Sequence, residues 1–469
     1  MIEQKPKYNL MPTGEKIIYT LYHADVLTHF KVKYIASVYV QNDSSQLQLR
    51  ATLKVVPNST GRGIFDISSI VDSYVSPDYE GGKVLENSGN DYSMANNTPF
   101  IVQYHDIHRI DEYSTARNTI KYMKVIFTME GATTQTSNVI SIGSTQQTPN
   151  LLIYNGVLHD TDILNKSTSD NNIGYNLNYH NLILNDTDAK FLTNAPTKQY
   201  VREGDYATLA FFQNYDDDFV VGGGTNPIVN QVDVQFYYNG STTGSLLNIP
   251  IQSNKGGHKS ASSEARTKML FVGVGIGNLT GSSLTIPANW DYYTVQAVND
   301  SSTNISKVYE FHKQTDDCKG YETIRLCWLN KHGVWDYYNF TKKSTRSIQS
   351  TRTSYQQHEG TWNEETFKIK GYLGGKRQNT NNVKESIEIN TDYITEEEGI
   401  WLEELLVSTD VFILEKSSTD NVTQGIIRKY VTPVIITNDS YTRQTKANDR
   451  LIQKTITIEK SINRRIQRR

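Results

Sequence analysis

One segment of the sequence crowds histidine and carboxylate side chains together, and these are the residue types that bind metals. Residues 104–112 read YHDIHRIDE and supply His105, Asp106, His108, Asp111 and Glu112. Imidazole and carboxylate groups are ordinary ligands of zinc and other transition metals. In a strand, however, residues three apart point to opposite faces, and the segment shows no helical stripe that would align them. The spacing therefore favours a solvated loop or strand end over a metal site.

Other polar and glycine-rich segments fall short of known site motifs. The carboxylates of residues 216–218 lack the glycine and the distant glutamate of a calcium-binding loop, which favours a polar turn. The run GVGIGN at residues 273–278 has Asn278 where a dinucleotide-binding motif needs its third glycine, and no helical pattern follows. The run KGGHKS at residues 255–260 lacks the first glycine of a phosphate-binding loop. No Gly-x-Ser-x-Gly turn points to a serine nucleophile. We therefore expect no cofactor, no metal and no catalytic residue.

The composition favours β-sheets that carry long polar loops. With 469 residues, the chain exceeds what one hydrophobic core usually supports. It holds 30 Tyr against 14 Phe, and Tyr is favoured both in strands and at protein interfaces. The 47 basic and 50 acidic residues give a net charge of −3, so no global field attracts nucleic acid or an anionic membrane. Any contact with nucleic acid has to be local.

The first residues and the two cysteines bear on where the protein is made. The N-terminal residues contain no apolar region of a signal peptide, and no apolar run approaches the roughly 18 residues of a spanning helix. We therefore expect synthesis in the cytoplasm and no membrane-spanning segment. Two cysteines, Cys318 and Cys327, are too few for a disulfide framework. Two free thiols are expected, with a bridge across neighbouring strands as the alternative.

Residues 1–145 are predicted to form an N-terminal β-sandwich module. Apolar and polar residues alternate along three expected strands, at residues 30–40, 47–55 and 121–129. Residues 67–75 switch to a helical period, with Asp66 as a plausible N-cap for a short covering helix. The polar run at residues 143–150 is predicted to be a linker.

Residues 146–315 are predicted to form a middle module with an immunoglobulin-like β-sandwich fold. The expected strands cover residues 151–154, 206–212, 232–238, 268–274, 292–298 and 308–311. Asn239 and Gly240 follow one of these strands and predict a tight hairpin turn. The number and spacing of the strands are typical of an immunoglobulin-like sandwich.

Residues 316–469 are predicted to form a C-terminal α+β module with one helix packed on a sheet. A hairpin is expected at residues 325–340, around a corner at residues 330–333. Thr395 precedes three glutamates in a capping-box pattern, and one apolar stripe follows, made of Trp401, Leu402, Leu405 and Leu406. Further strands are expected at residues 366–372, 411–415, 426–430, 434–437 and 452–458. The chain as a whole is therefore predicted to be mainly β.

The last nine residues form a basic tail in a chain that is otherwise near neutral. They read SINRRIQRR and carry Arg464, Arg465, Arg468 and Arg469. Such a cluster can stay solvated, dock into an acidic groove of a neighbouring subunit, or contact DNA phosphates. The sequence leaves these three interpretations open.

Three segments carry a resemblance to a known class of proteins. They are WLNKHGVWDYYNF (328–340), ITEEEGIWLEELLVSTDVFI (394–413) and the ending from Tyr430 to Arg469. They resemble the C-terminal modules of tail and baseplate structural proteins from tailed phages that infect Bacteroidetes, including crAss-like phages. The N-terminal hairpin followed by GIFDISSIVDSYV is similar to the opening module of such proteins. The resemblance implies a virion subunit, a tail hub, ring or baseplate part, that assembles with other tail proteins and carries no catalytic motif.

Within that class we expect a homo-oligomeric ring of six or twelve copies. The candidate interface residues are the arginines of the tail and four aromatic residues: Trp328, Trp335, Tyr337 and Tyr338. The alternative is a compact receptor-binding protein, in which some of these aromatics, or Trp290, Tyr292 and Tyr293, stack on host glycans. Burial in the β-core is the competing interpretation for both sets. A glycan-degrading enzyme would need two carboxylates roughly 5–9.5 Å apart in a cleft, which no motif indicates.

Overall fold

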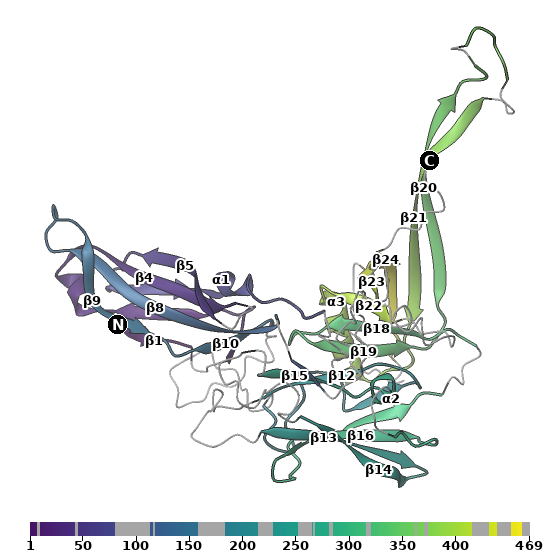
Figure 1. The fold of residues 1–469 in the computed structure, drawn as a ribbon, viewed down its shortest axis with the longest axis horizontal. Coiled ribbons are helices and arrows are strands. Elements are labelled where there is room, and N and C mark those ends of the chain that lie inside the picture. The colour runs from purple at the N-terminus through teal and green to yellow at the C-terminus, as the bar shows by residue number, and fades with distance from the viewer. Residues whose placement is uncertain are drawn as a thin grey trace, which may run out of the picture. The chain divides into compact units, whose positions relative to one another are not determined.

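The chain is mainly β and builds several sheets with few helices, as the composition predicted (Figure 1). The computed structural model describes residues 1–6, 10–42, 46–79, 113–115, 118–157, 183–213, 228–251, 265, 268–280, 285–315, 320–361, 364–369, 374–414, 431–438 and 452–461. The chain divides into two compact units. The first contains Met1–Thr315 and Leu329–Asp336, and the second contains Asp316–Trp328 and Tyr337–Arg469.

The largest sheet of the first unit contains the long N-terminal hairpin that the alternating pattern predicted. Its strand order is β2-β10-β8-β4-β5, with β9 paired to β8. The strands are β2 (Leu10–Pro12), β4 (Phe30–Gln41), β5 (Leu47–Val55), β8 (Ile120–Ala132), β9 (Ile140–Gln147) and β10 (Leu151–Tyr154). Along β4, Tyr34, Ala36 and Val38 are buried and alternate with more exposed residues. One face of this sheet therefore faces a core.

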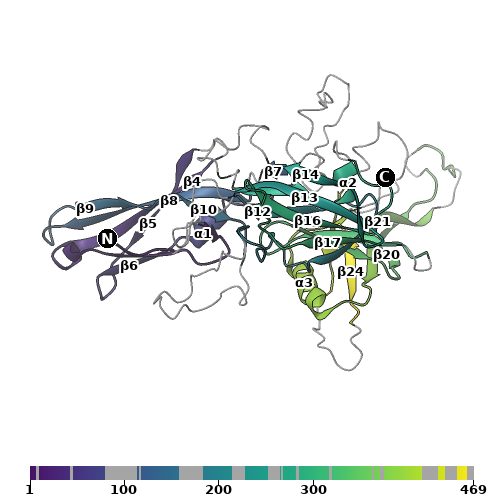
Figure 2. The same ribbon diagram turned by 90° about the horizontal axis from the view of Figure 1, so that it is seen from below.

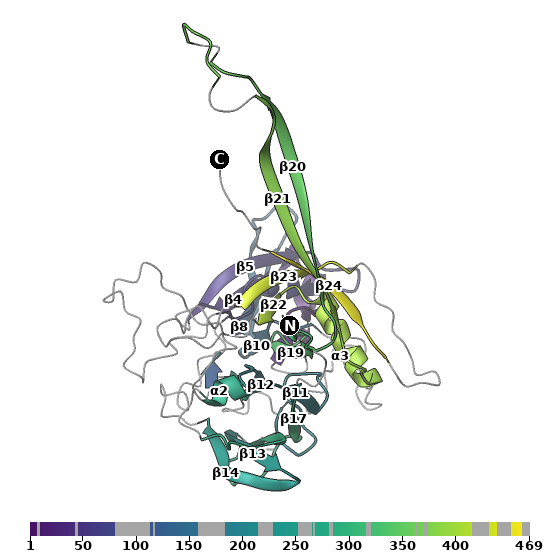
Figure 3. The same ribbon diagram turned by 90° about the vertical axis from the view of Figure 1, so that its right-hand side faces the viewer.

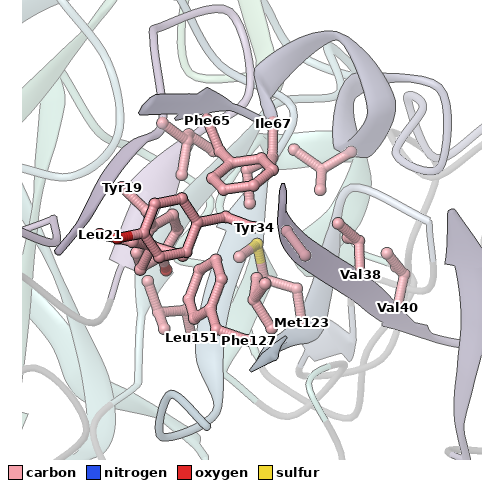
Figure 4. Close-up of a cluster of buried hydrophobic side chains, with 14 of the residues drawn as sticks. Tyr19, Leu21, Tyr34, Val38, Val40, Phe65, Ile67, Met123, Phe127 and Leu151 are labelled. Atoms are coloured by element: carbon pink, nitrogen blue, oxygen red, sulfur yellow. The ribbon is translucent and has the colours of Figure 1, made fainter. Parts of the chain in front are cut away.

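A smaller sheet shares that core. It is formed by β1 (Ile2–Gln4), β3 (Ile18–Tyr22) and β6 (Arg62–Asp66), in the order β1-β3-β6. Three buried rings meet at the centre of the cluster, where Phe127 lies 5.2 Å from Tyr19 and 6.0 Å from Phe65 between ring centroids (Figure 4). Figure 4 shows these rings converging from three different strands.

Two short helical segments lie in the same region. They are the 3-10 helix η1 (Ala24–Leu27) and the one-turn helix α1 (Ser68–Asp72). The predicted short helix is therefore confirmed. The Asp66 carboxylate accepts a hydrogen bond from the Ser68 amide at 3.1 Å, so it satisfies a free amide at the helix start, although the N-cap position is Ile67.

The prediction of a linker at residues 143–150 is wrong. Most of this run belongs to β9, which pairs antiparallel with β8. The following strand, β10, was expected in the middle module, but it pairs with β8 and runs parallel to β2 in the first sheet. All four residues of β10 are buried. A polar composition favours loops only on average, and here strand pairing with residues far away in sequence overrides it.

The rest of the first unit contains a five-stranded sheet and a three-stranded sheet. The five strands, in the order β11-β17-β16-β13-β14, are β11 (Lys198–Val201), β17 (Tyr309–Lys313), β16 (Tyr292–Asn299), β13 (Val229–Tyr238) and β14 (Ser241–Pro250). The three strands, in the order β12-β15-β7, are β12 (Thr208–Phe212), β15 (Met269–Gly273) and β7 (Tyr113–Thr115). Asn239 and Gly240 have φ angles of 51° and 75°, which confirms the predicted hairpin turn between β13 and β14.

The second unit is built on a seven-stranded sheet with one helix, as the sequence predicted. The order is β19-β18-β22-β23-β24-β21-β20. The strands are β18 (Ile324–Leu329), β19 (Trp335–Phe340), β20 (Thr345–Gln357), β21 (Gly375–Asn390), β22 (Val411–Leu414), β23 (Val431–Ile436) and β24 (Thr455–Lys460). Helix α3 (Glu396–Val407) begins with the predicted capping box of Thr395 and Glu398.

Two strand predictions for this unit need comment. A strand was expected at residues 366–372. Of this segment the structure describes residues 366–369, and they form no strand. The strand expected at residues 426–430 lies outside the described residues. Conversely, the two longest strands of the unit, β20 and β21, were not predicted.

Candidate assembly surface

The four aromatic residues proposed for an interface lie largely inside the protein. Trp328, Trp335 and Tyr337 are buried, and Tyr338 is half-buried. The Trp328 ring lies 5.1 Å from the ring of Trp401 on α3, and the Tyr338 ring lies 6.0 Å from it. Buried rings leave no open face for a partner. The competing interpretation, a β-core role, therefore holds for Trp328, Trp335 and Tyr337.

The buried Arg325 guanidinium holds Tyr337 and the neighbouring strand in place. It lies 5.1 Å from the centre of the Tyr337 ring and donates a hydrogen bond of 2.9 Å to Asn339. A cation that stacks on a ring and bonds an amide is stabilised although it is out of water. Tyr337 is thus a structural contact of β19.

The corner of the predicted hairpin, residues 329–336, belongs to the first unit and is anchored there. The Asn330 side-chain amide donates to the Leu192 carbonyl at 2.9 Å. Gly333 has a φ angle of 73°, and a Cβ at this position would lie 2.0 Å from the Asn155 carbonyl oxygen. The tight turn that the sequence predicted is therefore also a site of close backbone packing.

Several candidate residues lie outside the described part of the chain. These are the four arginines Arg464, Arg465, Arg468 and Arg469, the histidine and carboxylate segment 104–112, the carboxylates of residues 216–218, the run 255–260, and Cys318. Cys327 is described, and it is a free, buried cysteine. Burial raises the pKa of its thiol well above the usual range, so it is no reactive thiolate.

The glycines of the GVGIGN run allow close backbone packing. A helix does begin within the run, α2 (Ile276–Thr280), but it has only five residues. A Cβ on Gly275 would lie 2.3 Å from the Ala207 nitrogen. The Asn278 side chain accepts a hydrogen bond of 2.9 Å from the same Ala207 amide. The run is therefore a packing motif, and among the described residues no group of three or more His, Cys, Asp or Glu side chains could hold a metal ion.

A row of aromatic rings crosses the outer face of the five-stranded sheet. Tyr237, Tyr292, His312 and Tyr200 are directly paired across β13, β16, β17 and β11. Figure 2 shows β13, β16 and β17 side by side. The Tyr237 and Tyr292 rings stack at 4.7 Å, and Tyr292 and His312 stack at 4.9 Å. Such cross-strand pairs stabilise the sheet.

Within this row, Tyr292 does not present a flat ring face to a sugar. Both faces of Tyr292 are covered, one by Tyr237 and the other by His312, so only its edge is open. Trp290 and Tyr293, which were also considered for glycan stacking, are buried. Sugar rings stack on open aromatic faces, and the geometry therefore does not favour the receptor-binding alternative at these residues.

Among the described elements of the second unit, β20 and β21 form a highly exposed ribbon. The strands contain 13 and 16 residues and pair antiparallel from Thr345↔Glu388 to Gln357↔Gly375. Only the base of β21, from Ser386 to Asn390, also pairs with β24. Beyond that base the two strands pair only with each other and project from the sheet (Figures 1 and 3).

Neither face of the projecting ribbon is buried. Every residue from Thr345 to Ser354 is exposed, and most of β21 before Glu385 is exposed as well. Polar side chains bridge the strands, for example Ser347 to Ser386 at 2.7 Å and Thr353 to Thr380 at 2.5 Å. The ribbon is thus held by backbone and side-chain hydrogen bonds, without a hydrophobic layer.

The charge of the ribbon is one-sided. Residues 349–357 and 375–384 contain four cationic side chains, Arg352, Lys376, Arg377 and Lys384, and no aspartate or glutamate. Lys384 forms an ion pair with Glu459 at 3.1 Å, close to the base. The remaining three are spread towards the tip. These two strand segments are therefore cationic and attract an acidic surface at short range.

The base of the ribbon is fixed by ion pairs. Arg346 contacts Glu322 at 2.8 Å and Glu385 at 3.3 Å. Partial desolvation lowers the pKa of Arg346, but the hydrogen bonds and charges of the two carboxylates outweigh it and raise the pKa overall. Since the base is also paired with β24, the ribbon is oriented by the sheet it leaves.

The outward side of α3 combines apolar residues with carboxylates. Its inner side packs through Trp401, Leu402 and Leu405, which are buried. On the outer side Ile400 and Val407 are 46% and 73% exposed. Four residues of the helix add negative charge outside the buried side: Glu396, Glu397, Glu398 and Glu403. The helix therefore uses one side for the core, while Glu397, Ile400 and Val407 on its other side are exposed.

The ribbon was not predicted from the sequence, because its strands lack the alternation of apolar and polar residues that marks a strand with one buried face. The β20 sequence TRSIQSTRTSYQQ contains only Ile348 and Tyr355 as large apolar residues, and they are not in a period-two pattern. The one usable signal was the density of threonine and serine between two charged segments, which is weak. The α3 surface could have been found from the sequence, because Tyr393, Ile400 and Val407 repeat every seven residues.

Across the described part of the chain, no helix combines the length and apolar character needed to cross a membrane. No protein-family model matches the chain, and no curated protein matches it.

Two solved structures show a weak likeness. One is the native conformation of the Escherichia coli alpha-2-macroglobulin, with 9% identity and a TM-score of 0.17, covering 83% of this chain and 22% of that chain. The other is a Salmonella alpha-2-macroglobulin mutant, with 7% identity and a TM-score of 0.14, covering 93% of this chain and 28% of that chain. This chain thus aligns with less than a third of either structure, and these TM-scores are too low to support a shared fold.

Proposed function

We propose that the protein is a non-enzymatic structural subunit of a phage virion tail, a tail hub, ring or baseplate component. It forms a homo-oligomeric ring through protein-protein contacts and also contacts other tail proteins. The subunit is made and assembled in the cytoplasm of the bacterial host. The sequence resemblance of residues 328–340 and 394–413 to such tail proteins supports this class of function.

The observation that carries the ring proposal is the β20–β21 ribbon. A two-stranded ribbon with no buried face is marginally stable alone in water. Its edges also expose unpaired backbone groups, which natural proteins usually cover or protect. A neighbouring subunit would supply the missing contacts. If each copy gives one ribbon and receives one, the contacts are head-to-tail, and a suitable rotation closes them into a ring.

The rest of the chain fits this role. The sheets of the first unit share well-filled cores, such as the cluster around Phe127, and provide rigid bodies for a ring. The β18–β19 aromatic residues and α3 hold the second unit together from within. Among the described elements, the ribbon is one that buries little surface within its own chain.

The test is the mass of the protein in solution, measured with and without the ribbon. Light scattering at several concentrations, with negative-stain images of the same samples, gives the number of copies. In the shortened variant, Ser350 to Val383 are replaced by Asn-Gly. Because Gln349 and Lys384 are a directly opposed pair, this two-residue turn closes the hairpin in its native register.

We expect the full chain to form closed rings of six or twelve copies and the shortened variant to be a monomer. A melting temperature close to that of the full chain shows that the shortened variant is folded. If the shortened variant still forms rings, the ribbon is not needed for ring formation. If the full chain stays monomeric at every concentration, the ring proposal is contradicted. A compact trimer would favour the receptor-binding alternative instead.

A further inference from the structure

Among its described residues, the second unit exposes apolar side chains in two groups that each contain more than one residue. At the tip of the ribbon, Phe367 and Ile369 are 64% and 60% exposed. Along α3, Ile400 and Val407 are 46% and 73% exposed, and Tyr393 just before the helix is 59% exposed. Grouped exposed apolar side chains mark interaction sites more often than isolated ones do.

The α3 group forms a continuous stripe. Ile400 and Val407 are seven residues apart, which places them on the same side of the helix, about 10 Å from each other. Glu397 and Glu403 lie three residues from Ile400 on either side in sequence, so they border the stripe. The stripe is therefore an apolar surface with acidic margins.

The tip presents the complementary chemistry. Phe367 and Ile369 flank Lys368, whose amide and carbonyl hydrogen-bond Thr361 at 3.0 Å each, so the segment is held in place. Lys376 and Arg377 lie on β21 where the tip begins. Three carboxylates, Glu359, Glu364 and Glu365, also lie among the described residues of the tip. The cations that match the α3 margin are therefore Lys368, Lys376 and Arg377.

The tip does not reach the α3 stripe of its own chain. Residues 375–385, the part of β21 beyond β24, span roughly 35 Å at about 3.3 Å per residue. Figures 1 and 3 both show α3 beside the sheet and the tip far along the ribbon. The base of the ribbon is fixed by β24 and by Arg346, so the tip is held away from the α3 stripe of its own chain.

We infer that the ribbon tip of one copy docks on the outward side of α3 of the next copy. Phe367 and Ile369 cover Ile400 and Val407, while the cations of the tip face Glu397 and Glu403. The inference rests on the proposed ring function and names the two surfaces of its repeating contact. Since the two surfaces differ, the contact is head-to-tail and can close a ring.

Two variants of the full chain break the contact from either side. The tip variant carries Phe367→Asp and Ile369→Asp, and the helix variant carries Ile400→Asp and Val407→Asp. Each replaces apolar contacts by buried charges, so each protein alone should lose the ring and run as a monomer. The four positions are exposed in the single chain, so both variants should keep the melting temperature of the monomer.

Mixing the two variants gives the decisive measurement. The tip variant still has an intact α3 stripe, and the helix variant still has an intact tip. Together they can form one good contact and no second one, so light scattering should show dimers and nothing larger. The matched control is Ile435→Asp, which changes a 58% exposed residue of the same sheet and should leave the ring intact.

The outcomes separate the contact from the ring proposal. If the helix variant still forms rings while excision of the ribbon abolishes them, the ring proposal stands and α3 is not the receiving surface. If the mixture yields only monomers, or yields full rings, the head-to-tail pairing is wrong. If the unmodified chain never forms a ring, both proposals fail together.

The electrostatic part of the contact has its own test. Lys368→Glu in the full chain should weaken the ring, and so should Glu397→Lys. Combined in one chain, the two changes exchange the charges of the two side chains. The double variant should therefore form the ring at the same protein concentration as the unmodified chain. A double variant that is weaker than either single variant would show that these two side chains do not face each other.

Discussion

Two long antiparallel hairpins of this protein are built in different ways. The pair β4–β5 lies in a sheet with one buried face, and along β4 exposed and buried residues alternate. The pair β20–β21 is of similar length but is exposed on both faces over most of its projecting part. Both have regular backbone pairing. The comparison shows that a strand ladder by itself says little about what stabilises it.

The difference lies in what the side chains bury. In the first hairpin, Tyr34, Ala36 and Val38 lose nearly all their exposure, so the hydrophobic effect pays for chain ordering. In the ribbon, the side chains of threonine, serine and asparagine replace hydrogen bonds to water by hydrogen bonds to one another, which contributes little net free energy. The first hairpin is stabilised by burial within one chain, whereas the ribbon gains little from burial there; under the proposed ring, a neighbouring copy would supply its further contacts.

The largest expected effect comes from emptying the core under the first hairpin. Phe127→Ala removes a fully buried ring next to Tyr19 and Phe65, and should cost about 3–5 kcal/mol of unfolding free energy. The matched change Phe367→Ala, in the exposed ribbon tip, should change stability by less than about 0.5 kcal/mol. Urea unfolding measures the contrast when each change is made in the monomeric helix variant with Ile400→Asp and Val407→Asp. Similar losses in the two variants would abolish the distinction between the hairpins.

A smaller effect is expected at the helix that covers the other end of the ribbon's sheet. Thr395→Ala removes the side chain that accepts from the Glu398 amide at 3.1 Å, and it breaks the capping box. The cost should be about 1 kcal/mol. Thermal unfolding of the second unit measures it, and Thr395→Ser, which keeps the hydroxyl, is the control. An unchanged melting temperature for Thr395→Ala would mean that core packing alone sets the helix start.

Hydrogen exchange should separate the hairpins without a large change in global stability. In the monomeric helix variant, amides of residues 375–385 should exchange quickly, because opening the ribbon exposes almost no apolar surface. Amides at the centre of β4 and β8 should exchange slowly under the same conditions. In the ring, the ribbon amides should become protected. Equal protection of the ribbon in monomer and ring would show that it is stable alone.

The smallest effect is expected at a half-buried carboxyl on β13. Desolvation raises the pKa of Asp233, although a hydrogen bond from Gln231 opposes this. When the pKa of a carboxyl is higher in the folded state than in the unfolded state, the folded state binds its proton more tightly. This contribution to the free energy of unfolding is fully present at a pH below the pKa of the unfolded state, and it is lost as the pH rises through the pKa of the folded state. Near neutral pH the charged carboxylate therefore costs stability. Asp233→Asn should add about 0.5 kcal/mol or less at pH 7, a discounted value because the side chain is partly solvated.

The check is the melting temperature of both proteins across pH. The advantage of Asp233→Asn should shrink as the pH falls through the raised pKa of Asp233, because the carboxyl of the unmodified protein then takes up its proton. A constant difference between the two proteins at all pH values would attribute the effect to packing.

The sequence predicted the elements whose pattern follows from burial. The β4–β5 hairpin, β8, the Asn239-Gly240 turn and the capped helix α3 all carry local signals that match the structure. The prediction of a linker at residues 143–150 was wrong. The polar composition of this segment is typical of loops, but most of the segment belongs to β9, which pairs with β8. The candidate aromatics were identified from the sequence, but the contacts of Trp328 and Tyr338 with Trp401 could not be predicted from composition.

The sequence by itself determined the class of the fold, the covering helix and the absence of a recognised catalytic motif, because alternation, capping residues and motif spacing are local properties. Only the tertiary structure decided which strands share a sheet, which aromatic rings are buried and where the ribbon leaves its sheet. These depend on contacts between residues far apart in sequence, such as β21 with β24 and Trp328 with Trp401. A strand without a buried face leaves no hydrophobic period to read, so the ribbon became visible only in the fold.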